Sequence, residues 1–190
     1  MPELTYYIGV TLDGFIAGPQ DEVDFFGLSD DFLAHLGEEH ADLQPTHLRA
    51  ALGVADAPLT RHDTVVMGRR TYEPALEAGI ADPYAHLRTV VVSTTLPAGD
   101  GPVEVTPEPP LDVVRRLKAS DSPYDVYLAG GGRLAGEVSG EIDRLVVKKY
   151  PVVAGSGVRM IDRAFAPEQL RLEGVRTFDN GCAVLEYVRA

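Results

Sequence analysis

The chain has 190 residues, and 45% of them are hydrophobic, which is enough for one domain with a substantial core. Its 17 basic and 29 acidic residues give a net charge of −12, and such a surface repels nucleic acid and anionic lipid. No apolar run approaches the roughly 20 residues that cross a membrane, and the amino terminus lacks a signal-type apolar segment. We therefore expect a cytoplasmic protein with one domain, residues 1–190, and with neither nucleic acid nor membrane as a partner.

The amino-terminal half begins with a predicted strand over residues 4–10, followed by a turn at Asp13-Gly14. A helix is predicted to begin at Ser29, whose hydroxyl can cap it, with Asp30 and Asp31 at its positive end. The segments expected next are a polar loop or short helix over 44–61 and strands over 64–67 and 89–93.

The carboxyl-terminal half begins with a helix signal at Pro109-Pro110, and a buried strand follows over residues 124–128. Further strands are predicted over 142–150, 170–178 and 182–188, the last two joined by the hairpin turn Asp179-Asn180-Gly181. Strands that alternate with helices and end in a hairpin predict an α/β fold with three layers. Its central sheet is mixed and mostly parallel, with an antiparallel carboxyl-terminal hairpin.

Cysteine and histidine positions give no sign of a disulfide or a metal site. Cys182 is the only cysteine, and its strand-like surroundings favour a buried packing role over a reactive thiol. The histidines form no metal-ligand pattern, and we expect no metal and a surface position for His35, His40, His47, His62 and His86.

The most informative segment is the glycine run Gly130-Gly131-Gly132, which stands between a predicted strand and a predicted helix. This arrangement presents free backbone N–H groups and the positive end of a helix to an anion. Glycines let the backbone approach a phosphate closely and adopt angles that other residues avoid. Arg133 adds a fixed charge beside the turn. A tight structural turn is the alternative interpretation.

A second phosphate-binding signal follows the strand over residues 64–67. Gly68 allows a tight exit, Arg69 and Arg70 bring two charges into an acidic protein, and Thr71 can cap the next helix. Ser93-Thr94 supplies hydroxyls at a third strand end. Two phosphate-binding strand ends in one sheet predict a dinucleotide with a further phosphate, whereas a surface turn with solvated arginines is the alternative.

Taken together and in this order, these motifs resemble the dihydrofolate reductase superfamily, and most closely the branch that includes the riboflavin-biosynthesis reductase domain. The segments that carry the resemblance are residues 9–17, 67–73, 92–94, 129–132 and 151–158. The resemblance implies a central mixed sheet of about eight strands, NADPH as cofactor and a small heterocyclic substrate. Branch relatives often pair, and the apolar strands over 145–153 and 182–188 also suggest a homodimer.

The resemblance also assigns residues to parts of the cofactor. Arg69, Arg70 and Thr71 would hold the adenosine phosphates, with Ser93 and Thr94 nearby. The turn would hold the pyrophosphate, with a cis peptide at Gly130-Gly131 or Gly131-Gly132. The complete set of implied cofactor-binding residues is Leu12, Asp13, Gly14 and Ala17 near the nicotinamide, together with Gly68, Arg69, Arg70, Thr71, Ser93, Thr94, Gly130, Gly131, Gly132, Arg133 and Leu134.

Two carboxylates are candidates for the catalytic acid. Asp31 matches the position of the pteridine-binding carboxylate of dihydrofolate reductases, but helix capping is the alternative role. Asp24 is the second candidate, in a loop before the helix. The chain has no tryptophan, which typical dihydrofolate reductases place shortly before that carboxylate, so dihydrofolate is a doubtful substrate.

Two other functions fit the same residues. Gly130–Ala135 satisfies the glycine fingerprint of a Rossmann dehydrogenase, although that motif should open a βαβ unit and be followed by an acid about 20 residues later. A nucleotide-binding module without turnover is the other alternative, because neither carboxylate is a secure catalytic group.

Overall fold

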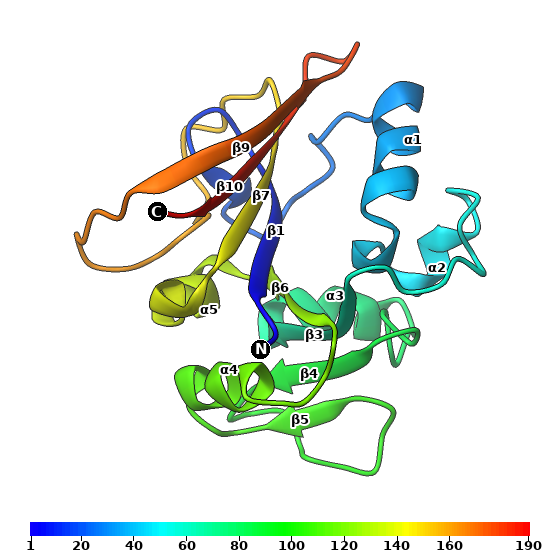
Figure 1. Cartoon of the computed structure of the whole chain (residues 1–190), viewed down its shortest axis with the longest axis vertical. Helices are drawn as coiled ribbons and strands as arrows, with labels where there is room; N and C mark the ends of the chain where they lie inside the picture. Colours follow the sequence, from blue (N-terminus) through cyan, green and yellow to red (C-terminus); the bar gives the residue numbers. More distant parts are fainter.

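The computed structural model describes all residues from 1 to 190 and is built around a central β-sheet (Figure 1). The strands of this sheet are β1 (Leu4–Val10), β3 (His62–Gly68), β4 (Arg88–Val92), β5 (Glu104–Thr106), β6 (Asp125–Gly130), β7 (Arg144–Lys149), β9 (Leu170–Thr177) and β10 (Ala183–Arg189). Their spatial order is β5-β4-β3-β6-β1-β7-β10-β9. A separate antiparallel pair consists of β2 (Phe15–Ala17) and β8 (Val158–Arg159).

The sheet confirms the predicted mixed architecture. Its six strands from β5 to β7 are parallel, β10 runs antiparallel to β7, and β9 runs antiparallel to β10. Gly181 has a φ of 79° in the hairpin turn between β9 and β10, a conformation that favours glycine. The first strand, β1, lies inside the sheet. Its two neighbours, β6 and β7, come from the later half of the chain, after the chain has formed β3 and β4.

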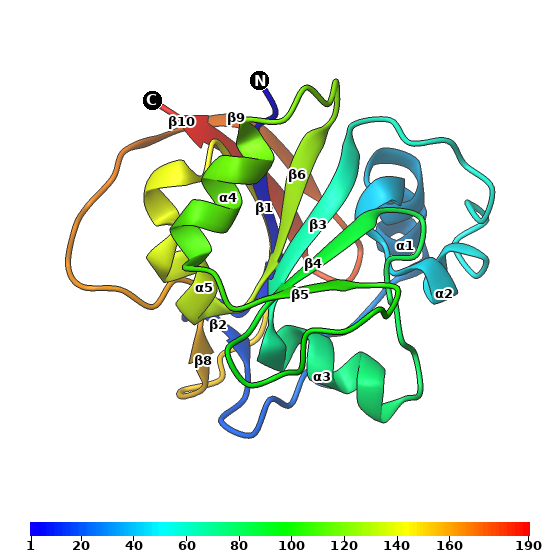
Figure 2. The ribbon, with the colours of Figure 1, turned by 90° about the horizontal axis from the view of Figure 1, so that it is seen from below.

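Helices cover both faces of the sheet. They are α1 (Asp30–Glu39), α2 (Thr46–Arg49), α3 (Arg69–Glu77), α4 (Pro110–Lys118) and α5 (Gly132–Glu137), with the 3₁₀ turns η1 (Ala41–Leu43) and η2 (Ser139–Glu141). Figure 2 shows α4 and α5 on one face, α1 and α2 on the other, and α3 near the end of the sheet where β3 stops. None of these helices combines the length and the hydropathy needed to cross a bilayer.

Each face of the sheet carries its own hydrophobic core. Tyr7 and Met67 belong to the core under α1, whereas Tyr6 and Val66 belong to the core under α4 and α5. Neighbouring residues of a strand point to opposite faces, so a strand that is covered on both faces must be apolar at successive positions. This explains the consecutive apolar residues of the covered strands β4 and β7.

Two predicted surface histidines are buried, so the expectation was wrong for His35 and His62. Their exposed fractions are 5% and 4%. His35 follows Phe32 by three positions, which places both on the inner face of α1, where its ring lies 5.1 Å from that of Phe178. His62 opens β3, and its backbone N–H donates to the carboxylate of Asp42.

The apolar strands expected to supply a pairing edge lie inside the sheet. β7 and β10 are each paired on both sides, and the free edge at this end is β9, where Leu172 and Val175 are exposed. The homodimer stays a prediction. Cys182, which precedes β10, is buried as expected, and burial raises the pKa of its thiol.

Candidate functional site

The predicted cofactor segments meet at one edge of the sheet, where the parallel strands β1, β3, β4 and β6 end (Figure 2). A Cβ placed on Gly68 would lie 3.9 Å from the carbonyl oxygen of Gly130. A Cβ placed on Gly131 would lie 3.5 Å from the hydroxyl of Thr71 and 4.0 Å from the side chain of Ile16. Three segments that are far apart in the sequence therefore surround the glycine turn.

The three glycines of the turn have different roles. Gly130 has a φ of 112°, and the peptide bond between Gly130 and Gly131 is cis, at one of the two expected positions. A Cβ on Gly132 would overlap the carbonyl oxygen of Arg159. Gly131 has a φ of −87°, so the expectation that the glycines of this turn adopt angles that other residues avoid was wrong at this position. Packing and backbone angle require the two outer glycines, whereas a Cβ on Gly131 would make only ordinary contacts with Thr71 and Ile16.

The turn leads directly into α5, whose first N–H groups have no partner within the helix. The first N–H of the helix with a backbone partner is that of Ala135, which donates to the carbonyl of Gly131 at 3.0 Å. The N–H groups of Gly132, Arg133 and Leu134 therefore remain for a ligand. The side chain of Leu134 is buried in the core. Arg133 is 89% exposed and pairs with Glu137. Both residues can therefore serve an anion at the turn through their backbone.

Arg69 and Arg70 are the first two residues of α3, but each already has a carboxylate partner. Arg69 pairs with Glu73 at 2.6 Å, and Arg70 pairs with Asp21 at 2.6 Å. All four side chains are at least one-third exposed, and such surface pairs contribute little stability. A phosphate can therefore compete for either guanidinium.

The hydroxyls at the ends of β3 and β4 differ from the expected arrangement. Gly68 occupies the cap position of α3, and Thr71 lies within the helix, so the expectation that Thr71 caps it was wrong. Ser93 is buried, and its oxygen accepts hydrogen bonds from the N–H groups of Thr95 and Leu96, which shapes the turn after β4. Thr94 is exposed beside it.

The loop after β1 is anchored by Asp13. Its carboxylate accepts hydrogen bonds from the Thr11 hydroxyl at 2.6 Å and from the N–H groups of Ala154 and Gly155 at 3.1 and 2.6 Å. These bonds, with that from Thr11 foremost, lower the pKa of Asp13 to about 2. Asp13 therefore joins this loop to the segment after β7 and stays ionised.

The other residues expected near the nicotinamide lie in or beside the same loop. Leu12 is 53% exposed, and its backbone is held by the carbonyl of Val152 and by the ammonium of Lys149. Gly14 has a φ of 93°, and Ala17 is buried. An exposed leucine that is fixed at its backbone is suited to contact a flat ring.

The two candidate carboxylates lie in different surroundings. Asp31 accepts hydrogen bonds from the Ser29 hydroxyl and from the N–H groups of Phe32 and Asp179, and the Ser29 bond contributes most to lowering the pKa of Asp31. The expectation that the Ser29 hydroxyl caps α1 was wrong, because this hydroxyl donates to the carboxylate of Asp31 instead. Asp31 thus links α1 to the β9–β10 turn, and Asp24 is exposed in the preceding loop.

The residue that the sequence patterns missed is Lys148, on the face of β7 that α1 covers. Its ammonium lies 3.8 Å from the ring centre of Tyr7 and forms no ion pair, and burial lowers the pKa of Lys148 to about 7. The neighbouring Tyr150 ring lies 4.4 Å from Phe26. A lysine inside the apolar run 142–150, facing the core at strand spacing, is the signal that could have identified it.

Comparison with known proteins bears on this geometry. The family model "RibD C-terminal domain" matches residues 2–184. The chain belongs to this family. A Bacillus subtilis (strain 168) protein, "Uncharacterized protein YwjB", is 31% identical over 189 residues, which cover 97% of this chain and 96% of that protein.

Two solved structures share the fold of this RibD C-terminal domain. One is a protein from Shewanella sp. PV-4 described as a riboflavin biosynthesis protein, with a TM-score of 0.71, 20% identity, and coverage of 100% of this chain and 99% of that one. The other is a Thermotoga maritima diaminohydroxyphosphoribosylaminopyrimidine deaminase/5-amino-6-(5-phosphoribosylamino)uracil reductase, with a TM-score of 0.66 and 14% identity. The chain is fully covered in that comparison and spans 57% of the Thermotoga chain.

The partly buried Lys148 predicts a pH-dependent stability. Lys148 loses its proton near pH 7 in the folded state and at about 10.4 when unfolded, so the unfolded state binds more protons between these values. The contribution of Lys148 to the free energy of unfolding therefore rises with pH over this interval. We expect Lys148→Met to stabilise the fold by about 1–3 kcal/mol below pH 7 and progressively less toward pH 10.

Urea unfolding of both proteins at several pH values measures this difference. A gap between the two proteins that stays constant from pH 6 to about 10 would show that the folded-state pKa of Lys148 is not lowered.

Proposed function

We propose that this RibD C-terminal domain protein is an NADPH-dependent reductase of a small heterocyclic substrate. The substrate class is that of the aminopyrimidines, one of which appears in the name of the Thermotoga relative. The observation that carries the proposal is the convergence of two anion-binding surfaces at one sheet edge. The Gly131 turn presents free N–H groups, and the adjacent helix α3 begins with Arg69, Arg70 and Thr71.

The residues present fit a dinucleotide with an extra phosphate. The backbone at Gly131 and the N–H groups that begin α5 would hold the pyrophosphate. The extra phosphate would replace Glu73 and Asp21 as the partner of the exposed guanidinium groups of Arg69 and Arg70. When bound, NADPH supplies the hydride. Leu12 would then contact the nicotinamide ring from the loop that Asp13 anchors.

In this proposal, Lys148 supplies the proton. A general acid works best when its pKa is near the working pH, and burial lowers the pKa of this ammonium to about 7. With Asp31 engaged by three donors, Lys148 replaces the carboxylates as the candidate acid. The aromatic rings of Tyr7, Tyr150 and Phe26 beside it suit a flat heterocycle.

The alternatives fare differently. In a Rossmann dehydrogenase the glycine turn would open the first βαβ unit, whereas here it follows β6, late in the chain and just before the strands that end in the hairpin. The nucleotide-binding module without turnover predicts the same cofactor contacts. It differs in assigning no chemical role to Lys148, so turnover decides between the two.

The role of Gly131 is tested by Gly131→Ala. The new Cβ makes only ordinary contacts within the protein but stands where the pyrophosphate must approach, so we expect NADPH to bind at least about tenfold more weakly with little loss of stability. Fluorescence titration with NADPH measures it. Gly140→Ala, where a Cβ meets nothing within 4 Å, is the control and should bind normally. Normal NADPH affinity in Gly131→Ala would refute the pyrophosphate site.

The two arginines should make the protein prefer NADPH over NADH. Losing a charge-assisted phosphate contact costs about 1.5–3 kcal/mol, so Arg69→Ala or Arg70→Ala should weaken NADPH binding by about 10- to 150-fold. NADH affinity should stay unchanged. Arg171→Ala, which removes an exposed guanidinium on β9, is the control. Equal affinities for both cofactors, unaffected by either substitution, would contradict the assignment.

Turnover tests the reductase itself. NADPH oxidation is measured with a panel of pterins and ribitylated aminopyrimidines, and with any substrate found we expect Lys148→Met to lower single-turnover hydride transfer at least about tenfold at saturating NADPH. The wild-type rate should fall above pH 7, because the ammonium loses its proton there. Arg171→Ala, on the exposed edge strand β9, serves as the control. An unchanged rate in Lys148→Met would remove Lys148 as the acid.

A further inference from the structure

An apolar pocket lies on the side of the sheet that carries α4 and α5. It is near the amino edge of the sheet, where the parallel strands begin, whereas the proposed NADPH site lies at the carboxyl edge, where they end. Its volume is about 220 Å³. The start of β7, the turn η2 and the loop over residues 160–169, which connects β8 to β9 (Figure 2), enclose it. We call it the loop pocket; its apolar lining includes Ile142, Leu145, Met160, Ile161 and Leu170.

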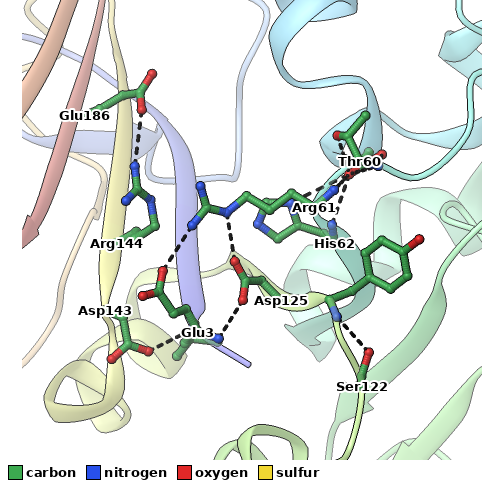
Figure 3. A network of polar contacts seen from close by, with 12 residues as sticks. Glu3, Thr60, Arg61, His62, Ser122, Asp125, Asp143, Arg144 and Glu186 are labelled. Carbon is green, nitrogen blue, oxygen red and sulfur yellow. Dashed lines mark hydrogen bonds and ion pairs between the residues drawn. The ribbon is translucent and has the colours of Figure 1, made fainter. Parts of the chain in front are cut away.

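The polar side chains of the loop pocket already have partners within the chain. Arg163 pairs with Glu168 at 2.6 Å. Asp143 accepts the backbone N–H that begins β1 at 2.7 Å, and Arg144 pairs with Glu186 at 3.5 Å (Figure 3). No buried side-chain nitrogen or oxygen of the lining residues lacks a hydrogen-bond partner. An occupant therefore needs no polar group to bond to the pocket, and an apolar one fits it best.

The loop that closes the pocket also carries the most exposed aromatic side chain of the protein. Phe165 is 95% exposed and does not line the pocket, although Arg163 and Ala166 on either side of it do. An apolar cavity of about 150 Å³ binds benzene, so the loop pocket has room for a phenyl ring. One chain thus presents an exposed ring and an apolar pocket of matching size next to each other.

An apolar sheet face continues from the pocket. Leu172 and Val175 on β9 lie opposite Tyr187 and Leu185 on β10, which pack against the core under α4 and α5, so all four point to this side of the sheet. Leu172 is 49% exposed and Val175 is 56% exposed. Leu170, which begins β9 and lines the pocket, connects the two areas. We call the pocket, Phe165 and this hairpin face the loop–hairpin surface; apolar patches of this kind mark interaction sites.

Charge favours a second copy of the chain as the partner at this surface. Two molecules that each carry a net charge of −12 repel one another, so they can associate only where the local charge is small. Glu168 pairs with both Arg163 and Arg189, and Glu173 is likewise shared by two guanidinium groups. Asp162 is the only carboxylate of the loop without an ion pair. The loop–hairpin surface therefore carries little net charge.

We propose that two copies of this chain pair through the loop–hairpin surface, and that Phe165 of each copy inserts into the loop pocket of the other. In a two-fold contact the same patch meets itself, so a ring and a pocket that adjoin on one chain can be exchanged reciprocally. Both pockets are then filled and the assembly closes as a dimer. The exposed leucine and valine side chains of β9 are covered in the same contact.

Tryptophan fluorescence tests the insertion directly. The chain has no tryptophan, so Phe165→Trp introduces a single fluorophore whose emission reports whether position 165 is in water or in an apolar site. We expect wild type to sediment as a pair of 20.5 kDa chains at micromolar concentration. On dilution, the emission of Phe165→Trp should move to longer wavelength over the concentrations at which sedimentation of the same variant shows the pair separating.

Substitutions on both sides of the contact test its residues. Phe165→Ala removes the inserted ring and Leu170→Ala alters the pocket, and each should weaken dimerisation at least about tenfold. Leu48→Ala is the matched control, because Leu48 is an apolar side chain on α2 that is 45% exposed on the other side of the sheet. It should dimerise as the wild type does.

Four results would overturn the proposal. The first is a wild-type protein that stays monomeric at high micromolar concentration. The second is a dimer that Phe165→Ala leaves unchanged, because another surface then forms it. The third is short-wavelength emission of Phe165→Trp at every concentration, which would place the ring in the pocket of its own chain. The fourth is emission that shifts only with phosphatidylcholine vesicles, which would assign the surface to lipid.

Discussion

The close contact between α5 and the backbone of residues 159–162 determines the shape of the carboxyl edge. A side chain at Gly132 would overlap the carbonyl of Arg159, and one at Gly136 would overlap that of Asp162, so only glycines allow this approach. In the same segment, the carbonyl of Met160 accepts a hydrogen bond from the Tyr6 hydroxyl at 2.8 Å. It thereby ties the glycine turn to β1, on which the proposed site depends.

This tie extends to the loop that would meet the nicotinamide. The N–H of Met160 donates to the carbonyl of Gly14 at 3.0 Å, and β2 pairs with β8 beside it. Asp13 holds the other side of the loop through Ala154 and Gly155. The loop after β1 is thus positioned by backbone contacts to late segments of the chain, and few of its own side chains are needed for its conformation.

Local signals made much of this fold predictable, and tertiary contacts account for the rest. The strand over residues 4–10, the glycine turn and the β9–β10 hairpin each carry their signal within a few residues, and the structure confirms them. β5 and β8 were missed because they are three and two residues long and form only by pairing with β4 and β2. The burial of His62 and the role suggested for Lys148 depend on neighbours that no local pattern reveals.

The two edges of the sheet also differ in how their arginines are paired. At the carboxyl edge, the Arg69 and Arg70 side chains are 45% and 58% exposed, so an incoming phosphate can displace their carboxylates at low cost. At the amino edge, Arg144 is 17% exposed between two carboxylates, and its pairs are harder to open. The exposed pairs therefore suit an anionic cofactor, even though the protein as a whole is strongly acidic.

The most direct test of the proposed cofactor site is a titration of the protein with NADPH, followed by the nuclear magnetic resonance signals of its backbone N–H groups. Saturable shifts at Gly131, Gly132, Arg133, Leu134 and Thr71, with weaker binding of NADH and no change at Thr5 or His62, are the predicted result. Saturable binding that leaves the Gly131–Leu134 amides unperturbed, or no binding at all, would contradict the claim that this edge holds the cofactor.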